Sequence, residues 1–270
     1  MRALAISGLW EDAEPDLIGP LTAILQTDPA DAVRAAAASA LGAFVLAGEL
    51  DELDAALAMR AEQALLSSYQ SGEEVVEVQA RALESLAYSG EAGLRQMIED
   101  AYYASEDEMR LSAIRAMGRS ADARWRALVR AELASPDAAM RAEAARATGE
   151  LEAKAAVPEL IQMLEDDDPS VRLAAIEALG HLGGRDARDA LREMANGADA
   201  DDAAAAEDAL EEMLFLDEAG EISALGEEGD EDEDDEAEDD YYQRNRNRGK
   251  SQDESRTSRS DQSTPLDEDL

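Results

Sequence analysis

The chain of 270 residues lacks cysteine, has a single histidine (His181) and contains only 4% aromatic residues. Without cysteine it has no disulfide framework, no thiolate metal ligand and no cysteine nucleophile. A Ser-His-Asp triad would depend on His181 alone, and one histidine without neighbouring ligands is most often a capping or surface residue. With so few large side chains, a core has to form through close contacts between alanine-rich helices.

Positive charge is also scarce, because 24 Lys and Arg residues face 64 Asp and Glu residues, which gives a formal net charge of -40. A charge of this sign repels nucleic acids and anionic membranes, so we expect neither as a partner. No apolar run approaches the roughly 20 residues of a membrane-spanning helix. The N-terminus lacks the basic start and apolar stretch of a signal peptide. The sequence therefore predicts a soluble cytoplasmic protein.

What the sequence does contain is an internal repeat with a constant period. A phrase recurs at Met109-Arg110, Met140-Arg141 and Val171-Arg172, each time followed by an alanine-rich run that ends Ala-Met-Gly, Ala-Thr-Gly or Ala-Leu-Gly. Positions 109, 140 and 171 are equally spaced, and one such step earlier and later reaches Val78 and Asp202. A fixed period in this range is typical of a solenoid in which each repeat is a pair of helices.

The repeat predicts where the helices lie. The second helix of each pair is expected to begin near Met1, Val33, Val78, Met109, Met140, Val171 and Asp202. The first helices are expected at residues 17–26, 50–68, 92–103, 121–134, 156–165 and 185–195. Glycines at 42, 118, 149 and 180 are expected to let the second helices end. The step from Val33 to Val78 is clearly longer than the one from Val78 to Met109, and we expect a longer first helix within 48–70.

The two ends of the chain depart from the repeat. Met1–Trp10 has the pattern of a second helix without a first one, so we expect either that Trp10 caps the array or that residues precede Met1. Residues 217–270 hold 21 acidic and six basic residues, including an acidic run at 227–240. Such a segment has too little apolar surface to offset its ordering entropy. We expect residues 1–216 to form the array and 217–270 to form a disordered acidic tail.

The residues at 167–183, Asp-Asp-Pro-Ser-Val-Arg-Leu-Ala-Ala-Ile-Glu-Ala-Leu-Gly-His-Leu-Gly, resemble the HEAT repeat in the short form of bacterial phycobilisome-lyase-like proteins. Ala156–Leu164 resembles the first helix of that repeat. The resemblance covers roughly residues 1–215 and implies an all-α, right-handed α-solenoid of about six and a half HEAT-like helix pairs. It is specific for the fold and not for the function, because one fold supports unrelated activities.

Some relatives in this resemblance carry chemistry. Deoxyhypusine-hydroxylase-like members bind two irons through repeated His-Glu pairs, whereas His181 is followed here by Leu182. HEAT-like DNA glycosylases need a basic groove, and the charge of this chain has the wrong sign. No residue suited to bilin transfer stands out. We therefore expect no catalytic residue, no cofactor and no metal site.

Two sets of arginines recur at fixed places in the repeat. The resemblance implies that the first set pairs with aspartates in the turns as a structural ladder, interrupted at Gln79 and Ala203: Arg2, Arg34, Arg110, Arg141 and Arg172. The second set lies at helix positions opposite the core, which line the concave surface of a HEAT-like stack. With one tyrosine it comprises Arg81, Tyr88, Arg115, Arg119 and Arg146.

The second set has two interpretations. Arginine and aromatic residues dominate binding hot spots, so the set is a candidate partner site, with Tyr102, Tyr103 and Trp125 nearby in sequence. Alternatively, the arginines pair with glutamates of the chain such as Glu84 and Glu143, and the three aromatics fill gaps between helices. Both interpretations stay open at the level of sequence.

The sequence favours a non-catalytic scaffold or adaptor that binds a protein partner on its concave face. Arg115, Arg119 and Arg146 would contact carboxylates of an acidic segment, and Tyr88 would be an apolar anchor. An alternative is an accessory subunit of a modifying enzyme, or a lyase-like protein, that holds a substrate protein or a tetrapyrrole. A third is a chaperone-like role in which the acidic tail shields a basic client. The tail itself is either a solubilising segment or a tether that returns to the arginines.

Overall fold

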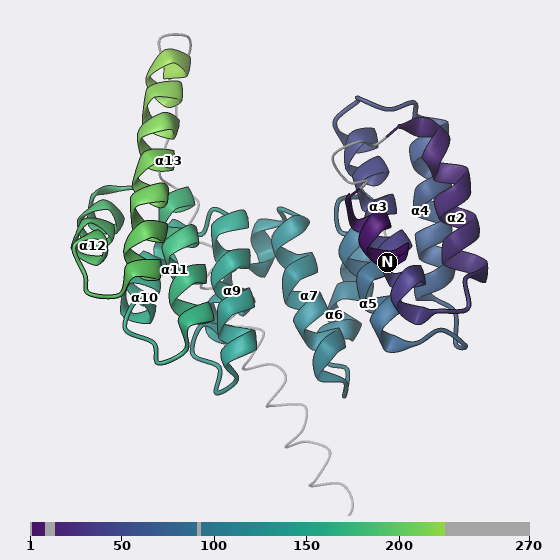
Figure 1. Ribbon diagram of the computed structural model, residues 1–270, viewed down its shortest axis with the longest axis horizontal. Helices are drawn as coiled ribbons and strands as arrows, with labels where there is room; N and C mark the ends of the chain where they lie inside the picture. Colours follow the sequence, from purple (N-terminus) through teal and green to yellow (C-terminus); the bar gives the residue numbers. More distant parts are fainter. Residues whose placement is uncertain (1, 9–13, 91–92, 225–270) are drawn as a thin grey trace, which may run out of the picture. The chain divides into compact units, whose positions relative to one another are not determined.

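The computed structural model describes residues 2–8, 14–90 and 93–224, and the helices as far as Glu221 belong to one compact unit. All regular elements in these ranges are helical (Figure 1). Six of them are the first helices of pairs: α2 (Ile18–Thr27), α4 (Ala55–Tyr69), α6 (Leu94–Tyr102), α8 (Arg126–Glu132), α10 (Val157–Met163) and α12 (Arg185–Ala195). The second helices are α1 (Arg2–Ser7), α3 (Asp31–Glu49), α5 (Val76–Leu86), α7 (Asp107–Arg119), α9 (Ala138–Glu150), α11 (Pro169–Leu182) and α13 (Ala200–Ala224).

The helices form two layers. In one layer α1, α3, α5, α7 and α9 each contact the next second helix in the series. Gly180 of α11 likewise faces Ala209 of α13. In the other layer α2, α4, α6, α8 and α10 each contact the second helix that follows them. Stacking of this kind buries one face of every helix pair against its neighbours, and it is the arrangement of an α-solenoid.

The second helices keep the predicted period, since α5, α7, α9, α11 and α13 begin at the equally spaced positions 76, 107, 138, 169 and 200. Each begins two residues before the position at which the sequence predicts its start, which is Val78, Met109, Met140, Val171 or Asp202. The cause is visible in α9 and α11, where Asp137 and Asp168 accept hydrogen bonds from the backbone amides of Ala139 and Ser170. These aspartates are N-caps, and they set the first turn ahead of Met140 and Val171.

Four of the six first helices lie within the predicted ranges, whereas α2 and α4 end one residue beyond theirs. Two of the six have short α-helical parts. α8 and α10 follow short 3-10 turns, η3 (Ala123–Trp125) and η4 (Lys154–Ala156), and each α-helical part spans seven residues. α12 occupies 185–195 as predicted. A 3-10 turn before an α-helix tightens the entry of the chain without adding helix length.

The extra residues between the second and third repeats are divided between two helices. α3 passes through Gly42 and ends at Glu49, where the sequence predicts an end near Gly42, and α4 adds a 15-residue first helix. The prediction of a longer first helix alone is therefore incomplete. Ala43, Phe44 and Val45 are buried, and their packing extends α3 beyond the usual length of the repeat.

The glycines at 118, 149 and 180 do not end helices, which corrects the prediction made for them. All three lie inside α7, α9 and α11, and each faces a residue of the next second helix. A Cβ on Gly149 would lie 3.2 Å from the Cα of Ala178, and one on Gly180 would lie 3.0 Å from the Cβ of Ala209. The glycines let neighbouring second helices approach closely, as the shortage of large side chains requires.

Helix α3 is long and apolar enough to cross a membrane by length and composition, although the sequence predicts no such run. Its contacts with α1, α2, α4 and α5 account for that composition, because it is a core helix of the array. The predicted cap Trp10 and nearly all of the predicted tail at 217–270 lie outside the described residues, while α13 continues past residue 216 to Ala224.

Candidate functional site

The first set of arginines forms pairs that run from one repeat to the next. Four of the five reach an acidic residue of the following repeat: Arg2 with Asp28, Arg34 with Glu74, Arg141 with Asp166 and Arg172 with Asp202. Arg141 shows the full geometry, because its Nε and Nη2 bond the two oxygens of Asp166 at 2.9 and 2.8 Å. Its Nη1 also bonds the carbonyl oxygen of Ser135 at 3.0 Å. Forked pairs of this type are directional and hold adjacent repeats in register.

Two members of the ladder series depart from this geometry. At Gln79 the side-chain amide bonds the carbonyl oxygens of Tyr69 and Ser71, so a neutral group binds the preceding turn. Arg110 has an ion pair only with Asp107 of its own helix, at 3.5 Å, among the pairs seen in the described residues. The ladder is therefore weakest where α7 meets the turn before α9.

The second set of arginines lies on the face formed by the second helices, around the buried carboxylate of Glu84. Glu84 on α5 is 3% exposed. It accepts hydrogen bonds from the Ser112 hydroxyl at 2.6 Å and from Arg115 Nη1 at 2.7 Å. Arg81 Nη1 bonds its other oxygen at 3.0 Å. This face of α5 and α7, with the adjoining surfaces of α1, α3 and α9, is called here the second-helix face.

Arg115 connects Glu84 to a second buried carboxylate. Its Nε and Nη2 bond Glu143 on α9 at 2.9 and 2.5 Å, so three successive second helices are tied through one guanidinium. Burial opposes the charge of Arg115, but its hydrogen bond to Glu143 and the charges of Glu84 and Glu143 raise its pKa. Three nitrogens of the guanidinium are thus engaged inside the chain, and Arg115 presents little binding capacity to an outside carboxylate.

The remaining residues of the set are less tightly engaged. Arg119 bonds the backbone oxygen of Glu84 at 3.2 Å, and its guanidinium carbon lies 5.5 Å from the centre of the Tyr88 ring. Arg146 is 41% exposed, and its two ion pairs, with Glu143 and Glu177, are long at 3.8 and 3.6 Å. The glutamate pairing that the sequence left open as an alternative is therefore present, most strongly at Arg115.

Glu150 on α9 adds a further carboxylate near Arg119. Partial removal of its carboxyl group from water raises the pKa of Glu150, although the residue keeps solvent-exposed surface. Arg119 opposes this rise, and Glu143 adds to it. Burial likewise raises the pKa of the Tyr88 hydroxyl, again against the charge of Arg119. Across the second-helix face, acids and arginines thus alternate, and the face is far less basic than the arginines alone suggest.

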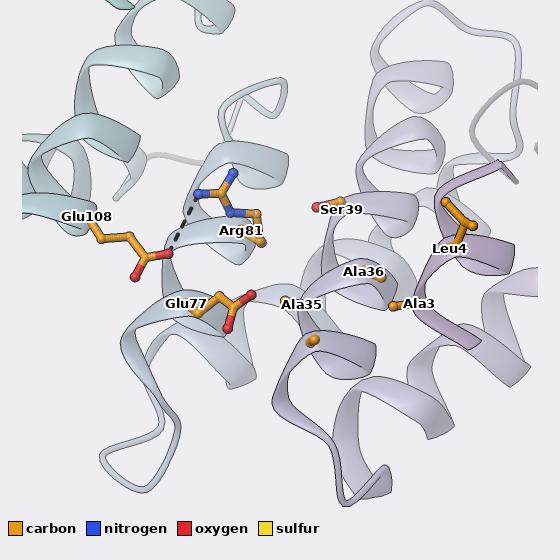
Figure 2. Close-up of a pocket in the computed structure, with 9 residues that line it drawn as sticks. Ala3, Leu4, Ala35, Ala36, Ser39, Glu77, Arg81 and Glu108 are labelled. Atoms are coloured by element: carbon orange, nitrogen blue, oxygen red, sulfur yellow. Dashed lines mark ion pairs between the residues drawn. The ribbon is translucent and has the colours of Figure 1, made fainter. Parts of the chain in front are cut away.

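A groove runs along this face through two adjoining pockets that share Ser39 and Arg81. The first, of about 390 Å³, is lined by Ala3 and Leu4 of α1, by Ala32, Ala35, Ala36 and Ser39 of α3, and by Glu77, Arg81 and Glu108. Figure 2 shows Arg81 and Glu108, paired at 3.9 Å, on one side of the pocket and the small side chains of α3 and α1 on the other. The second, of about 410 Å³, is lined by Ser39, Arg81, Glu84, Ser85, Arg115 and Arg119.

The alanine-lined part of the groove is a feature that the sequence reasoning missed. The positions are those that carry arginines in later repeats, and small residues such as Ala36 and Ser39 occupy them in α3. The signal in the sequence is the small size of these side chains, because small residues at positions that carry large ones in other repeats leave open space on the surface. Tyr102, Tyr103 and Trp125 are absent from its lining: Trp125 is buried, the Tyr102 hydroxyl bonds Glu132, and Tyr103 is 72% exposed.

His181 pairs with Glu212 of α13 at 3.2 Å on an exposed surface. Within the part of the chain that the structure describes, no group of three His, Asp or Glu side chains is placed to hold a metal ion.

A family model for HEAT repeats matches residues 126–211. The chain contains HEAT repeats. The matched residues run from α8 into α13, and the same pairing of helices continues toward the N-terminus through α2 to α7. No curated protein matches the chain.

Several solved structures are similar to this chain. Human deoxyhypusine hydroxylase in complex with glycerol is 20% identical, with 79% of each chain covered and a TM-score of 0.42. The complex of CpcE and CpcF of phycocyanin lyase from Nostoc is 18% identical over 79% of this chain and 89% of that one, with a TM-score of 0.47. An engineered protein is 21% identical over 73% and 96%, with a TM-score of 0.45. These likenesses concern the fold alone.

Proposed function

We propose that this HEAT-repeat protein is a non-catalytic cytoplasmic scaffold or adaptor that binds a segment of a partner protein along the groove of the second-helix face. The observation that supports it is the continuity of the two pockets through Ser39 and Arg81. A groove about two pockets long suits an extended or helical segment better than a compact small molecule.

The lining suggests how such a segment is held. Ala35, Ala36 and the 76% exposed Leu4 offer an apolar surface for one or two side chains. Arg81 and Arg119 stand at the other end, where a carboxylate or a backbone carbonyl of the segment can accept their hydrogen bonds. A mostly apolar centre with a few placed polar groups is the usual composition of a specific protein interface.

The arginines have different parts in this proposal. Arg115 holds α5, α7 and α9 together through Glu84 and Glu143, so it shapes the face without contacting the partner. Arg81, Arg119 and Arg146, with Tyr88, remain the proposed contacts, because each retains exposed surface toward solvent. The glutamates that alternate with them leave a face of mixed charge, which favours a segment with both apolar and acidic residues over a purely acidic one.

The test is to fill the groove. Ala32 is exposed and lines the first pocket, so A32W should block it without disturbing the core. The matched control is A23W, which places the same side chain at an exposed alanine of first helix α2, away from both pockets. Affinity capture from the source organism's lysate, with quantitative mass spectrometry, should lose at least one partner with A32W and keep it with A23W.

A third bait extends the test along the face. R146E reverses the charge of the most exposed arginine of the set. It should weaken binding of the same partner that the A32W variant fails to capture. Identical protein lists from the wild type, A32W and A23W would contradict the proposed site. If A32W abolishes capture of the partner and R146E does not, the partner contacts only α1, α3 and α5.

A further inference from the structure

The gap in the ladder at Arg110 has a counterpart in the sequence of the next repeat. The acids that pair with ladder arginines lie 26, 25 and 30 residues after Arg2, Arg141 and Arg172. Counted from Arg110, the same steps reach Ser135, Pro136 and Met140. Arg34 pairs with Glu74 across the long repeat, which also supplies an acid. The following repeat thus supplies Arg110 with no carboxylate at the places of these hydrogen-bonded acids. Arg172 also has a longer ion pair of 3.6 Å with Asp199, and the same step from Arg110 reaches Asp137.

The missing acid changes the surroundings of the guanidinium. The side chain of Arg110 is 37% exposed, whereas those of Arg34, Arg141 and Arg172 are 15%, 19% and 16% exposed. Arg2 of α1 is 63% exposed although it pairs with Asp28. Asp107, the partner of Arg110, is itself 83% exposed, and a pair of two exposed groups 3.5 Å apart contributes little. Arg110 therefore keeps most of the hydrogen-bonding capacity that its equivalents use inside the chain.

A pocket of about 400 Å³ opens where the acid is missing. Asp107, Arg110 and Leu111 of α7 line it from one helix, and the turn before α9 lines it from the other side with Ala134, Ser135, Pro136 and Asp137. Met140 and the end of α8 complete the lining. The pocket shares no lining residue with the groove of the second-helix face. It is a separate place on the molecule, next to an arginine that the repeat leaves without its usual partner.

We propose that this pocket is a second binding site, in which Arg110 takes the carboxylate of an Asp or Glu side chain from a partner protein. The incoming carboxylate occupies the place that Asp166 occupies beside Arg141, and bonds the guanidinium in the same forked manner. Leu111, Pro136 and Met140 contact the apolar residues that flank the acid. The partner thereby completes the ladder between α7 and α9.

The acidic side chains around the pocket do not prevent this. Asp137 caps α9 through the amide of Ala139, and Glu132 accepts the hydrogen bond of the Tyr102 hydroxyl. Asp168 stands in the same relation to Arg141 as Asp137 does to Arg110, one repeat apart. There a carboxylate pairs with the arginine despite the neighbouring acid.

The chain itself provides the probe for a test. A synthetic peptide of residues 164–170, Leu-Glu-Asp-Asp-Asp-Pro-Ser, carries the acid that Arg141 binds, and its matched control has Asn in place of Asp166. Binding to the full-length protein is followed through the side-chain Nε–H resonance of Arg110, assigned by its loss in R110K. We expect the resonance to move saturably with the peptide, and the Asn control to bind at least tenfold more weakly.

A variant of the protein tests whether an acid supplied by the chain itself competes with the peptide for Arg110. S135D places an acid 25 residues after Arg110, the same sequence separation that Asp166 has from Arg141. It should weaken binding of the peptide at least tenfold, while S135N should leave binding unchanged. An unmoved Arg110 resonance, or equal binding of both peptides, overturns the proposal. It is also overturned if E132Q shifts the Arg110 resonance in the free protein as much as the peptide does, because Glu132 would then be the missing acid.

Discussion

Gly118 of α7 lies so close to α9 that a Cβ placed on it would stand 2.9 Å from the Cα of Ala147. The neighbouring atom belongs to the backbone, so an added methyl group can be accommodated only if the two helices move apart. The same closeness recurs at Gly149 and Gly180, one and two repeats later. Close approach at one glycine per repeat is therefore a property of the stack from α7 to α13.

The first prediction concerns this contact. G118A should destabilise the protein by about 1–2 kcal/mol, because overpacking at the helix contact outweighs the helix propensity that alanine adds. The control is G19A in α2, where nothing lies within 4 Å of the added Cβ. That change should stabilise by about 0.5–1 kcal/mol through propensity alone. Urea denaturation followed by circular dichroism measures both, and equal effects of the two substitutions would show that Gly118 has no packing role.

A second prediction concerns the buried carboxylate of Glu84. E84Q removes the charge that Ser112, Arg115 and Arg81 bond, and leaves Arg115 half unpaired in a partly buried place. We expect a loss of about 2–4 kcal/mol in the free energy of unfolding. E177Q removes an exposed acid that lies 3.6 Å from Arg146, and should change stability by less than about 0.5 kcal/mol. Comparable losses in the two variants would contradict the central role given to Glu84.

The third prediction is a pH dependence of the ladder. The hydrogen bond from Arg141 holds the pKa of Asp166 below its usual value of 3.8, against the smaller opposing effect of burial. A carboxyl with a depressed pKa contributes stability that is complete above the unfolded pKa and is lost as the pH falls through the folded one. The difference in unfolding free energy between the wild type and D166N should therefore be constant from pH 5 to 7 and should shrink below about pH 4. If the difference in unfolding free energy between the wild type and D166N is unchanged at pH 3, the Arg141–Asp166 ion pair is not its source.

The fourth prediction addresses the gap at Arg110 through stability. S135D should pair with Arg110 and raise the free energy of unfolding by about 1 kcal/mol, within the range of a partly exposed ion pair. The gain should vanish in the R110Q background, since the double-mutant cycle isolates the interaction. S135N has the same shape without the charge and should give no gain. A gain of equal size in both arginine backgrounds would point to an effect on the turn and not on Arg110.

The spacing of apolar positions by itself determined the succession of helix pairs, and the second helices from α3 onward begin two residues before the predicted positions. This success has a physical reason, because every repeat buries the same face and the chain must return to it once in each period. The acidic, cysteine-free composition likewise limits the chemistry before any coordinates are known. The recurrent arginines could be recognised from sequence as two sets, one at the turns and one opposite the core.

The tertiary structure decided what those residues contact. Gly118 follows the helix pattern of a C-terminal glycine in sequence, and only the distance to Ala147 shows that it admits a neighbouring helix. Arg110 and Arg115 stand on one helix in the two different sets. The sequence does not settle which acid pairs with each, whereas the structure shows Arg115 held by Glu84 and Glu143, and Arg110 with only Asp107 among the described ion pairs. A period tells which side of a helix a residue faces. Which acid meets it depends on the side chain that the next repeat brings within reach, and that is settled by packing between helices.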